Sequence, residues 1–528
     1  MEYVNEINVI RKPYKKGRLG VAIAYPSLYE AAVRSLSIQM LYFYLNSFDE
    51  IMAERFVLKK IKGEEPAPVS LESRQPLKNF RLIIFSVHYE PDYVNIVRLL
   101  QSGGVPPLAE KRKQVVVVGG PPVIANPEPL CEIADVLVVG EIESTLPELM
   151  EKVFLYYDNK RAFLDSLEPE AGFYVPSRKD EEEIIFNYSD NLYLDFHPAA
   201  QFQPANGEWR RTTMIEVSRG CVRGCRFCME GWIFTPKRDR PVEDITWLAE
   251  KGFEGNGSRH LTLISLSLLD HREIDKLLET FVAEKYEFSF PSLRLDALNS
   301  ERLYLLAKSG QRTLVLAPET TCYRTSLAIG KPFFKERLIE VGREAVKLGF
   351  KSLKLYFMIG LPGEKKEDIE SIARLVKELS EATGYRGRHR LKLSVNVFVP
   401  KPQTPMQWFS MEKPDSIKSK MRKLRREVGD AAEVRLFKPA WAYVQCVLAR
   451  GGRELTKLIL EWAENGGGLG GWRKAVEYTQ TPVDKYVNEL KLDEEHPWSK
   501  VKLPMRLRVF EDYKIFKDIL SSLDNVER

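Results

Sequence analysis

Apolar residues in the first 150 positions form short, continuous runs that are separated by segments with a helical pattern. The runs span 18–25, 80–86, 114–119 and 135–140, and a helical pattern follows the first of them over 29–45. Continuous runs that are rich in β-branched residues predict a parallel sheet covered by helices on both faces. We therefore expect residues 1–150 to form a doubly wound α/β domain that binds ligands beyond the carboxyl ends of its strands.

A second series of strand and helix patterns begins after residue 207. Its apolar runs span 261–264, 313–317, 352–359 and 393–398. This repeat predicts a (β/α) barrel, full or partial, over 207–405. We expect residues 151–206 to form a charged connector, and residues 406–528 to form a small α+β extension that docks a substrate or covers the barrel.

The composition is that of a soluble chain with several domains. The 528 residues are 44% hydrophobic and 29% charged, with a formal net charge of +5. No run of about 18 apolar residues is present, so we expect no membrane span. Six cysteines are too few for a disulfide framework, and the first residues lack the basic and apolar regions of a signal peptide. Together these features favour the cytoplasm.

Three cysteines are closely spaced in the segment Cys221-Val-Arg-Gly-Cys225-Arg-Phe-Cys228. Iron–sulfur clusters are normally held by four cysteine thiolates, so a trio leaves one iron open for another ligand. A zinc site usually has four ligands in paired groups, and no second Cys/His pair lies nearby in the sequence. We therefore predict that Cys221, Cys225 and Cys228 are the metal ligands of one 4Fe-4S cluster.

Further segments accompany the cysteines in a fixed order. An apolar strand with a glycine loop, 213–220, precedes them, and Ala-Pro-Glu (317–319) and Tyr-Phe-Met-Ile-Gly-Leu-Pro-Gly-Glu (356–364) follow. The loops at 119–129 and 138–143 end two strands of the first domain. With the segment 397–408, they resemble the cobalamin (B12)-binding-domain branch of the radical S-adenosylmethionine (SAM) superfamily. The similarity is greatest to a subfamily whose members are sometimes fused to a second domain.

The resemblance implies three cofactors, namely a 4Fe-4S cluster, SAM and cobalamin. Its motifs place the SAM contacts at Phe227, Glu319, Arg324, Gly360, Pro362, Gly363 and Glu364. They place corrin contacts at Gly119, Gly120, Pro121, Gly140 and Glu141. Tyr25, Ser86 and Tyr89 are further candidates for the corrin pocket, but each equally fits a loop-packing residue. Glu319 also fits a salt-bridged carboxylate near a helix start, and the segment 360–364 also fits a plain turn from strand to helix.

One motif of many cobalamin domains is absent from the chain. This motif, Asp-x-His-x-x-Gly, supplies a histidine as the lower axial ligand of cobalt, but here the chain reads Tyr-Pro-Ser-Leu-Tyr-Glu over 25–30. His88 follows a different strand, and we interpret it as an ordinary polar loop residue. Cys131 and Cys446 lie among apolar residues, so we interpret them as core thiols, and Cys322 as a packed thiol.

The resemblance implies a C-methyltransferase that acts on an unactivated carbon, with an RNA base as one candidate target. Basic residues over 418–426 and the aromatic residues Phe437, Trp441 and Tyr443 suit RNA binding, but a solvated helix face and a core strand fit them slightly better. The alternatives are a radical SAM enzyme without functional cobalamin, which couples, rearranges or desaturates a lipid or small molecule, and a noncatalytic cluster protein. An electron donor such as a ferredoxin or flavodoxin is the expected partner. The sequence assigns no catalytic residue and no oligomeric state.

Overall fold

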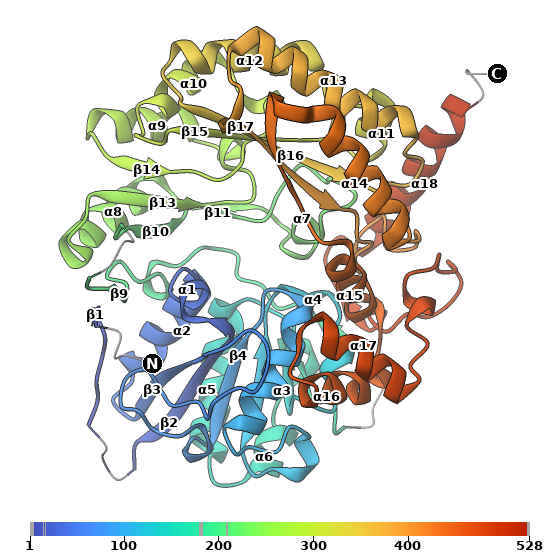
Figure 1. Cartoon of the computed structure of the whole chain (residues 1–528). Helices are drawn as coiled ribbons and strands as arrows, with labels where there is room; N and C mark the ends of the chain where they lie inside the picture. Colours follow the sequence, from blue (N-terminus) through green and yellow to red (C-terminus); the bar gives the residue numbers. More distant parts are fainter. Residues whose placement is uncertain (1–4, 14, 16, 179–182, 207–209, 525–528) are drawn as a thin grey trace.

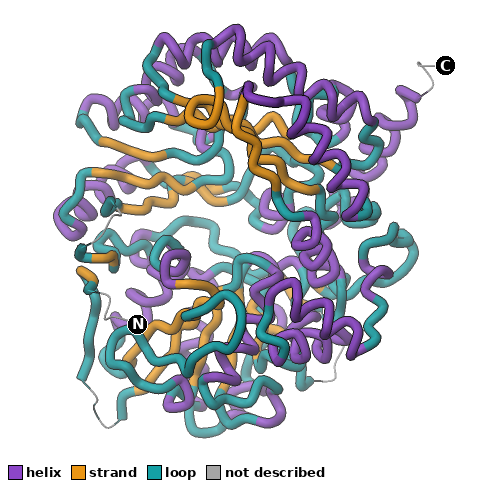
Figure 2. Tube along the Cα trace, viewed as in Figure 1, coloured by secondary structure: helices purple, strands orange, loops and turns teal. Residues whose placement is uncertain are grey.

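The computed structural model describes residues 5–13, 15, 17–178, 183–206 and 210–524. Two α/β units lie one above the other, and the C-terminal helices lie beside both of them (Figure 1). In each unit the strands gather at the centre and the helices lie outside them (Figure 2). None of the helices in the described part of the chain is both long and apolar enough to cross a membrane.

The first unit is built on a six-stranded sheet with the strand order β3-β2-β4-β5-β6-β7. Its strands are β2 (Leu19–Leu28), β3 (Ile51–Leu58), β4 (Leu82–Ser86), β5 (Val115–Gly119), β6 (Val136–Val138) and β7 (Phe173–Tyr174). All pairings are parallel except that of β7 with β6. The chain passes from β2 to β3 on one side and then to β4 on the other, so the order reverses between β2 and β4. Such a switch point opens a crevice at the carboxyl ends of the strands.

Helices cover both faces of this sheet. The helices α2 (Leu36–Ser47) and α5 (Ile142–Tyr156) pack on one face, and α3 (Tyr93–Ser102), α16 (Thr456–Glu464) and α17 (Gly468–Thr479) pack on the other. The doubly wound α/β fold predicted from the sequence is therefore confirmed. The helix expected over 29–45 is divided, because a turn at 33–35 separates α1 (Tyr29–Ala32) from α2.

The edge strand β3 was not predicted from the apolar pattern. Glu54 and Arg55 interrupt its apolar run, yet both side chains are buried. Arg55 forms ion pairs with Glu6 at 2.6 Å and Glu72 at 2.5 Å. Buried charges are tolerated only when they are paired, and both of these partners come from outside the strand.

The second unit is a curved series of parallel strands. The strands β10 (Thr213–Glu216), β13 (His260–Ile264) and β14 (Glu287–Ser289) form one sheet, and β15 (Thr313–Glu319), β16 (Ser352–Ile359), β17 (Gly387–Val397) and β18 (Ala432–Leu436) form the next. A bridge between Leu293 and Leu316 joins the two sheets. The outer helices are α8 (Val242–Asn256), α9 (Ile274–Ala283), α10 (Ser300–Ala307), α12 (Lys335–Lys347) and α13 (Lys366–Thr383). This arrangement is the partial barrel that the sequence predicts.

The C-terminal segment is distributed over both units. The strand β18 and the helix α14 (Pro414–Val428) extend the barrel, whereas α15 (Pro439–Arg450) and α16 pack on the first sheet. The last helix, α18 (Arg506–Asp524), lies against α11 (Tyr323–Ala328) at the barrel (Figure 1). The shorter elements are β1 (Glu6–Ile7), β8 (Ile184–Ile185), β9 (Gln203–Pro204), β11 (Ser218–Arg219), β12 (Arg238–Asp239), β19 (Val501–Lys502), α4 (Pro121–Ala125), α6 (Lys160–Asp165) and α7 (Met229–Ile233).

Candidate active site

The three closely spaced cysteines lie on the loop that leads from β11 into α7. All three are partly buried. The backbone N–H of Arg223 donates to Cys221 Sγ at 3.5 Å, and Arg294 Nη1 lies 3.2 Å from Cys225 Sγ. Hydrogen bonds to sulfur and nearby positive charge stabilise thiolates. These two contacts favour the negatively charged form of Cys221 and Cys225.

A cluster fits these thiols better than a single metal ion does. Among the described residues, no group of three His, Cys, Asp or Glu side chains is arranged to hold one metal ion. In an iron–sulfur cluster the thiolates bind different irons, so they stand farther apart than the ligands of one ion. Burial raises the pKa of Cys228 to about 12 and also raises the pKa of Cys221. Cationic iron would offset this cost by favouring the thiolate form.

Glu319, Arg324 and Gly363 lie at the carboxyl end of the barrel strands. Glu319 ends β15 with a φ of 66°, and its Oε1 atom is 2.8 Å from Lys331 Nζ. A residue other than glycine with this conformation is uncommon and is found preferentially at functional sites. Arg324 Nη2 donates to the carbonyl of Gly363 at 3.2 Å. The structure thus forms the salt bridge that was considered for Glu319, and it brings two of the predicted SAM contacts together.

The loop after β16 is braced by Glu364. Glu364 Oε2 accepts the Gly360 N–H at 2.9 Å and lies 2.7 Å from Lys420 Nζ. Gly360 has a φ of 84°, and a Cβ atom there would lie 2.6 Å from Ile417 Cδ1. Pro362 is half-buried. Glycine is therefore required at 360, and Glu364 holds the loop in place.

Phe227 is packed beneath the last helix of the chain. It is partly buried against a cluster that includes Trp408, Tyr513 and Phe516. In the same loop Arg226 forms an ion pair with Asp512 of α18 at 3.0 Å. The C-terminal extension thus covers the barrel beside the cysteine loop.

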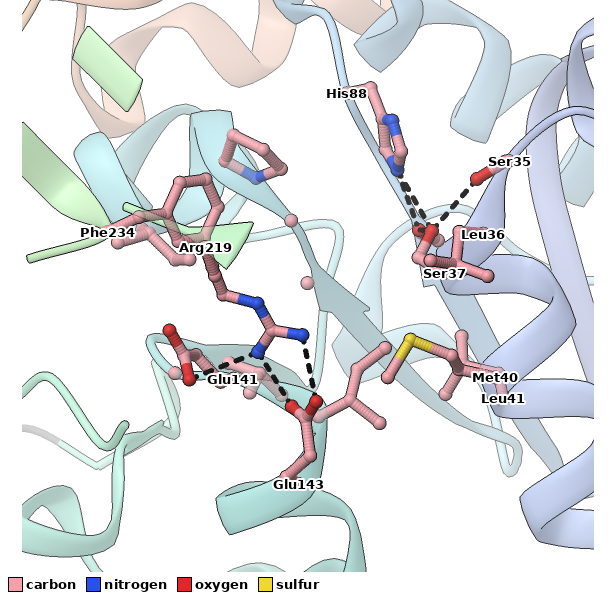
Figure 3. A pocket seen from close by; sticks show the side chains of 18 of the residues that line it. Ser35, Leu36, Ser37, Met40, Leu41, His88, Glu141, Glu143, Arg219 and Phe234 are labelled. Carbon is pink, nitrogen blue, oxygen red and sulfur yellow. Dashed lines mark hydrogen bonds and ion pairs between the residues drawn. The ribbon is translucent and has the colours of Figure 1, made fainter. Parts of the chain in front are cut away.

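A cavity of about 480 Å³ lies between the edge of the first sheet and the start of the barrel (Figure 3). Seven predicted corrin contacts line it, namely Tyr25, Ser86, Gly119, Gly120, Pro121, Gly140 and Glu141, whereas Tyr89 does not. A Cβ atom on Gly120, whose φ is 127°, would lie 1.9 Å from the carbonyl oxygen of Val87. No side chain can be accommodated there.

The sequence did not indicate how helices contribute to this cavity. Its inner part is an apolar slot between α2 and α5 over β4 and β5, lined by Met40, Leu41, Ile84, Val117, Leu146 and Leu149. Its polar part includes Ser35, Ser37 and His88. Glu230 and Phe234 line the barrel side, and both lie in or next to α7, which directly follows the cysteine loop. The cavity therefore reaches from the first sheet to β11 and α7, the two elements that flank the cysteine loop.

A cluster of acidic residues and arginines joins the two units at the cavity wall. Arg219 donates to Glu143 through two bonds of 2.8 Å, and it also contacts Glu216 at 2.7 Å and Glu141 at 3.1 Å (Figure 3). Arg238 forms a second bidentate pair with Glu141 at 2.7 and 2.8 Å. Glu141 is 4% exposed. It is thus both a cavity residue, as predicted, and part of a junction between the units, which was not predicted. We call these five residues the inter-unit ion cluster.

His197 is buried next to Glu216 of the inter-unit ion cluster. Its Nε2 atom accepts the Glu216 N–H at 3.2 Å, and its buried Nδ1 finds no partner among the described residues. Burial and the charge of Arg240 lower its pKa to about 3. Histidine in the unfolded chain has a pKa near 6.5. Between these two values the unfolded chain binds a proton that the folded chain does not.

We expect the free energy of unfolding to fall as the pH falls below about 6.5. The proton that His197 binds in the unfolded chain accounts for at most about 1.4 kcal/mol of this loss per pH unit. His197→Gln can still accept the Glu216 N–H but binds no proton in this range. Urea unfolding between about pH 5 and 6 should therefore show a smaller pH dependence in His197→Gln than in the wild type. His389→Gln, which alters an exposed histidine on β17, is the matched control. Equal slopes in the wild type and His197→Gln would refute this assignment.

The basic helix provides fewer available cations than its sequence suggested. In α14, Lys420 pairs with Glu364 and Glu412, and Lys423 pairs with Glu370 and Glu427. The aromatic residues Phe437, Trp441 and Tyr443 pack against hydrophobic cores. These observations favour a helix and core packing over an RNA-binding surface. The expected core strand was wrong for Trp441 and Tyr443, which lie on the helix α15. Cys131 and Cys446 are buried, as expected.

Two family profiles match this chain. One, described as radical SAM proteins, N-terminal, covers residues 37–176, and the other, the radical SAM superfamily, covers residues 215–376. An uncharacterized protein of Methanocaldococcus jannaschii is 30% identical over 448 residues, which are 84% of this chain and 91% of the relative. The chain belongs to the radical SAM superfamily and is an enzyme of that class. Members of the superfamily use a 4Fe-4S cluster and SAM.

More distant relatives include an uncharacterized methyltransferase of Pyrococcus horikoshii, which is 24% identical over 275 residues. That match covers 50% of this chain and 58% of the relative. The solved structure of TsrM, a radical SAM methyltransferase from Kitasatospora setae with cobalamin and a 4Fe-4S cluster bound, has a TM-score of 0.54 at 12% identity and covers 88% of this chain and 99% of TsrM. OxsB, a cobalamin-dependent SAM radical enzyme, has a TM-score of 0.52 at 14% identity over 96% of this chain and 80% of OxsB. The chain therefore shares the two-unit fold of these enzymes.

Proposed function

We propose that this enzyme is a cobalamin-dependent radical SAM methyltransferase that adds a methyl group to an unactivated carbon. The observation that carries the proposal is the cavity that reaches from the carboxyl edge of the first sheet to α7, next to the cysteine loop. A cofactor at the sheet edge would then lie beside the loop that carries the three cysteines.

The cavity suits cobalamin in shape and polarity. Cobalamin carries a flat corrin and a nucleotide tail that ends in an aromatic base. The slot between α2 and α5 is walled by aliphatic side chains and Met40, as a buried aromatic base requires. Gly119 and Gly120 bring the backbone to the cavity wall without side chains, which allows close approach to a large ring. The solved structures of TsrM and OxsB both hold cobalamin.

The residues of the chain have distinct tasks in this proposal. Cys221, Cys225 and Cys228 hold the cluster, and Glu319, Arg324 and the loop 360–364 orient SAM beside it. The inter-unit ion cluster fixes the cavity walls to one another and excludes water from them. The bound cofactors supply the chemistry, because the cluster provides the electron that cleaves SAM and methylcobalamin provides the methyl group.

One distant relative bears on the identity of the substrate. A tRNA-2-methylthio-N(6)-dimethylallyladenosine synthase of Herminiimonas arsenicoxydans is 23% identical over 294 residues, which are 51% of this chain and 60% of the relative. That similarity supports an RNA base as one candidate target. The paired lysines of α14 argue against this helix as the RNA-binding site. RNA binding stays a prediction.

Purification under anaerobic conditions from cobalamin-fed cells tests the proposal. We expect one 4Fe-4S cluster and one corrin per chain, measured from iron, cobalt and absorption spectra. The variant Leu146→Trp fills the apolar slot, and overpacking costs about 1–3 kcal/mol. It should therefore lower corrin affinity by roughly tenfold or more, while the cluster content, which reports on the intact barrel, stays unchanged. A wild-type protein with a full cluster but no corrin would overturn the proposal and favour radical coupling, rearrangement or desaturation.

A further inference from the structure

His88 has a fixed orientation at the wall of the cavity. It follows β4 by two residues, and β4 borders the switch point of the first sheet. Its Nε2 atom lies 3.0 Å from Ser37 Oγ and 3.2 Å from Ser86 Oγ, and Ser37 Oγ is 2.9 Å from Ser35 Oγ (Figure 3). The ring of Tyr25 meets the imidazole edge to face, with the centroids 5.6 Å apart. Three elements of the fold thus hold this one ring.

The side chain of His88 is held by more contacts than that of an ordinary polar loop residue. Ser35 and Ser86 are buried, while the imidazole itself is exposed and lines the cavity. Of the six histidines in the chain, His88 is the one that lines the cavity among the residues described. A histidine that binds a metal typically donates its second ring N–H to a nearby oxygen, which sets its tautomer and orientation. If Nε2–H donates to the serine hydroxyls, Nδ1 keeps its lone pair for a ligand.

We propose that His88 is the protein ligand on the lower face of the corrin cobalt, with Ser37 and Ser86 as the residues that position it. This inference rests on the proposed function, because it requires cobalamin in the cavity. The apolar slot is the second observation that supports it. An aromatic base held between α2 and α5 is removed from the cobalt, so the lower face is left for a side chain. Imidazole nitrogen is a common ligand of transition metals.

Four other cavity side chains with donor atoms are less suited to this role. Met40 is 4% exposed and packs with Leu36 and Met214. The ring of Tyr25 is engaged as the packing surface for the imidazole. Glu141 and Glu143 are committed to Arg219 and Arg238. His88 alone among the six histidines combines a cavity position with a hydrogen-bonded ring nitrogen.

Electron paramagnetic resonance of the protein loaded with cob(II)alamin tests the assignment. An axial nitrogen splits the cobalt lines, into triplets for the natural isotope and into doublets for nitrogen-15. We expect doublets when the protein is produced with 15N-labelled histidine and unlabelled cobalamin. Triplets that persist would identify the cofactor's own base as the ligand, and unsplit lines would indicate no axial nitrogen. Either result overturns the inference without affecting the proposed function. A protein that binds no corrin overturns both.

Three variants test whether the nitrogen splitting comes from His88. His88→Ala should lose the splitting completely. Its corrin affinity should fall because the nitrogen–cobalt contact is lost, but corrin should still bind, since the slot and the glycine loops are intact. His389→Ala, on the exposed end of β17, should retain the doublets. Ser37→Ala leaves the imidazole in place but removes one hydrogen-bond partner, so it should broaden or shift the nitrogen splitting. Doublets that survive in His88→Ala would contradict the proposal.

Discussion

Cys221→Ala, Cys225→Ala and Cys228→Ala are each expected to purify without a stable 4Fe-4S cluster and to lose reductive cleavage of SAM completely. The three thiols share one loop between β11 and α7. If these three thiols are the protein ligands, as we propose, one iron is free for SAM, and removal of one thiol leaves two. Because clusters of this kind are normally held by four ligands, two thiolates do not retain one.

Cluster loss is measured from the iron and sulfide content and from the spectrum of the reduced protein. SAM cleavage is measured from the yield of 5′-deoxyadenosine. Cys322→Ala is the matched control, because Cys322 is also partly buried and lies near the barrel strands but outside the loop. It should retain cluster and SAM cleavage. A cysteine variant of the loop with full iron content and normal cleavage would show that the thiol is not a ligand.

Most of the fold could be predicted because most of its strands coincide with continuous runs of apolar residues in the sequence. Four of the five parallel strands of the first sheet coincide with such runs, and so do four strands of the barrel. β3 was missed because Arg55 breaks its apolar run, and the residues that compensate this charge, Glu6 and Glu72, lie far away in the sequence. A local pattern does not contain such information.

Site residues could be predicted where they lie together on one loop. They were harder to predict where the side chains come from distant parts of the sequence. The cysteine loop and the glycine loops at 119–120 are contiguous in the sequence. In contrast, His88 was interpreted as an ordinary loop residue, and its support by Ser37 depends on how α2 packs beside β4. Lys420 was counted as an available cation, but its pairing with Glu364 joins positions 56 residues apart. In both cases the surroundings of the side chain depend on tertiary packing, which the local sequence does not contain.

Arg219→Met is expected to destabilise the junction of the two units by about 3–5 kcal/mol, the typical cost of removing one partner from a buried ion pair. The Arg219 side chain is 12% exposed, and that of Glu143 is 1% exposed. Without the guanidinium, Glu143 loses its two hydrogen bonds, and Glu141 and Glu216 each lose a positive neighbour. Arg435→Met is the matched control. Its pair with Glu433 is exposed at the arginine, and exposed pairs contribute about 0–1 kcal/mol.

The pH dependence of the same variant provides an independent measurement. Burial alone would raise the pKa of Glu216, but the charge and hydrogen bond of Arg219, together with the charges of Arg240 and Arg238, outweigh burial and lower this pKa. A carboxyl group with a lowered pKa in the folded state stabilises the protein above the unfolded value, and this contribution is lost as the pH falls through the folded value. In Arg219→Met the contribution should be absent at neutral pH, so its stability should depend less on pH below about 4.5. Addition of Glu143→Gln should recover part of the lost stability, because it removes the buried charge that the first substitution leaves unpaired. Independent, additive losses in the double variant would show that the two side chains do not act together, and would reduce the inter-unit ion cluster to separate contacts.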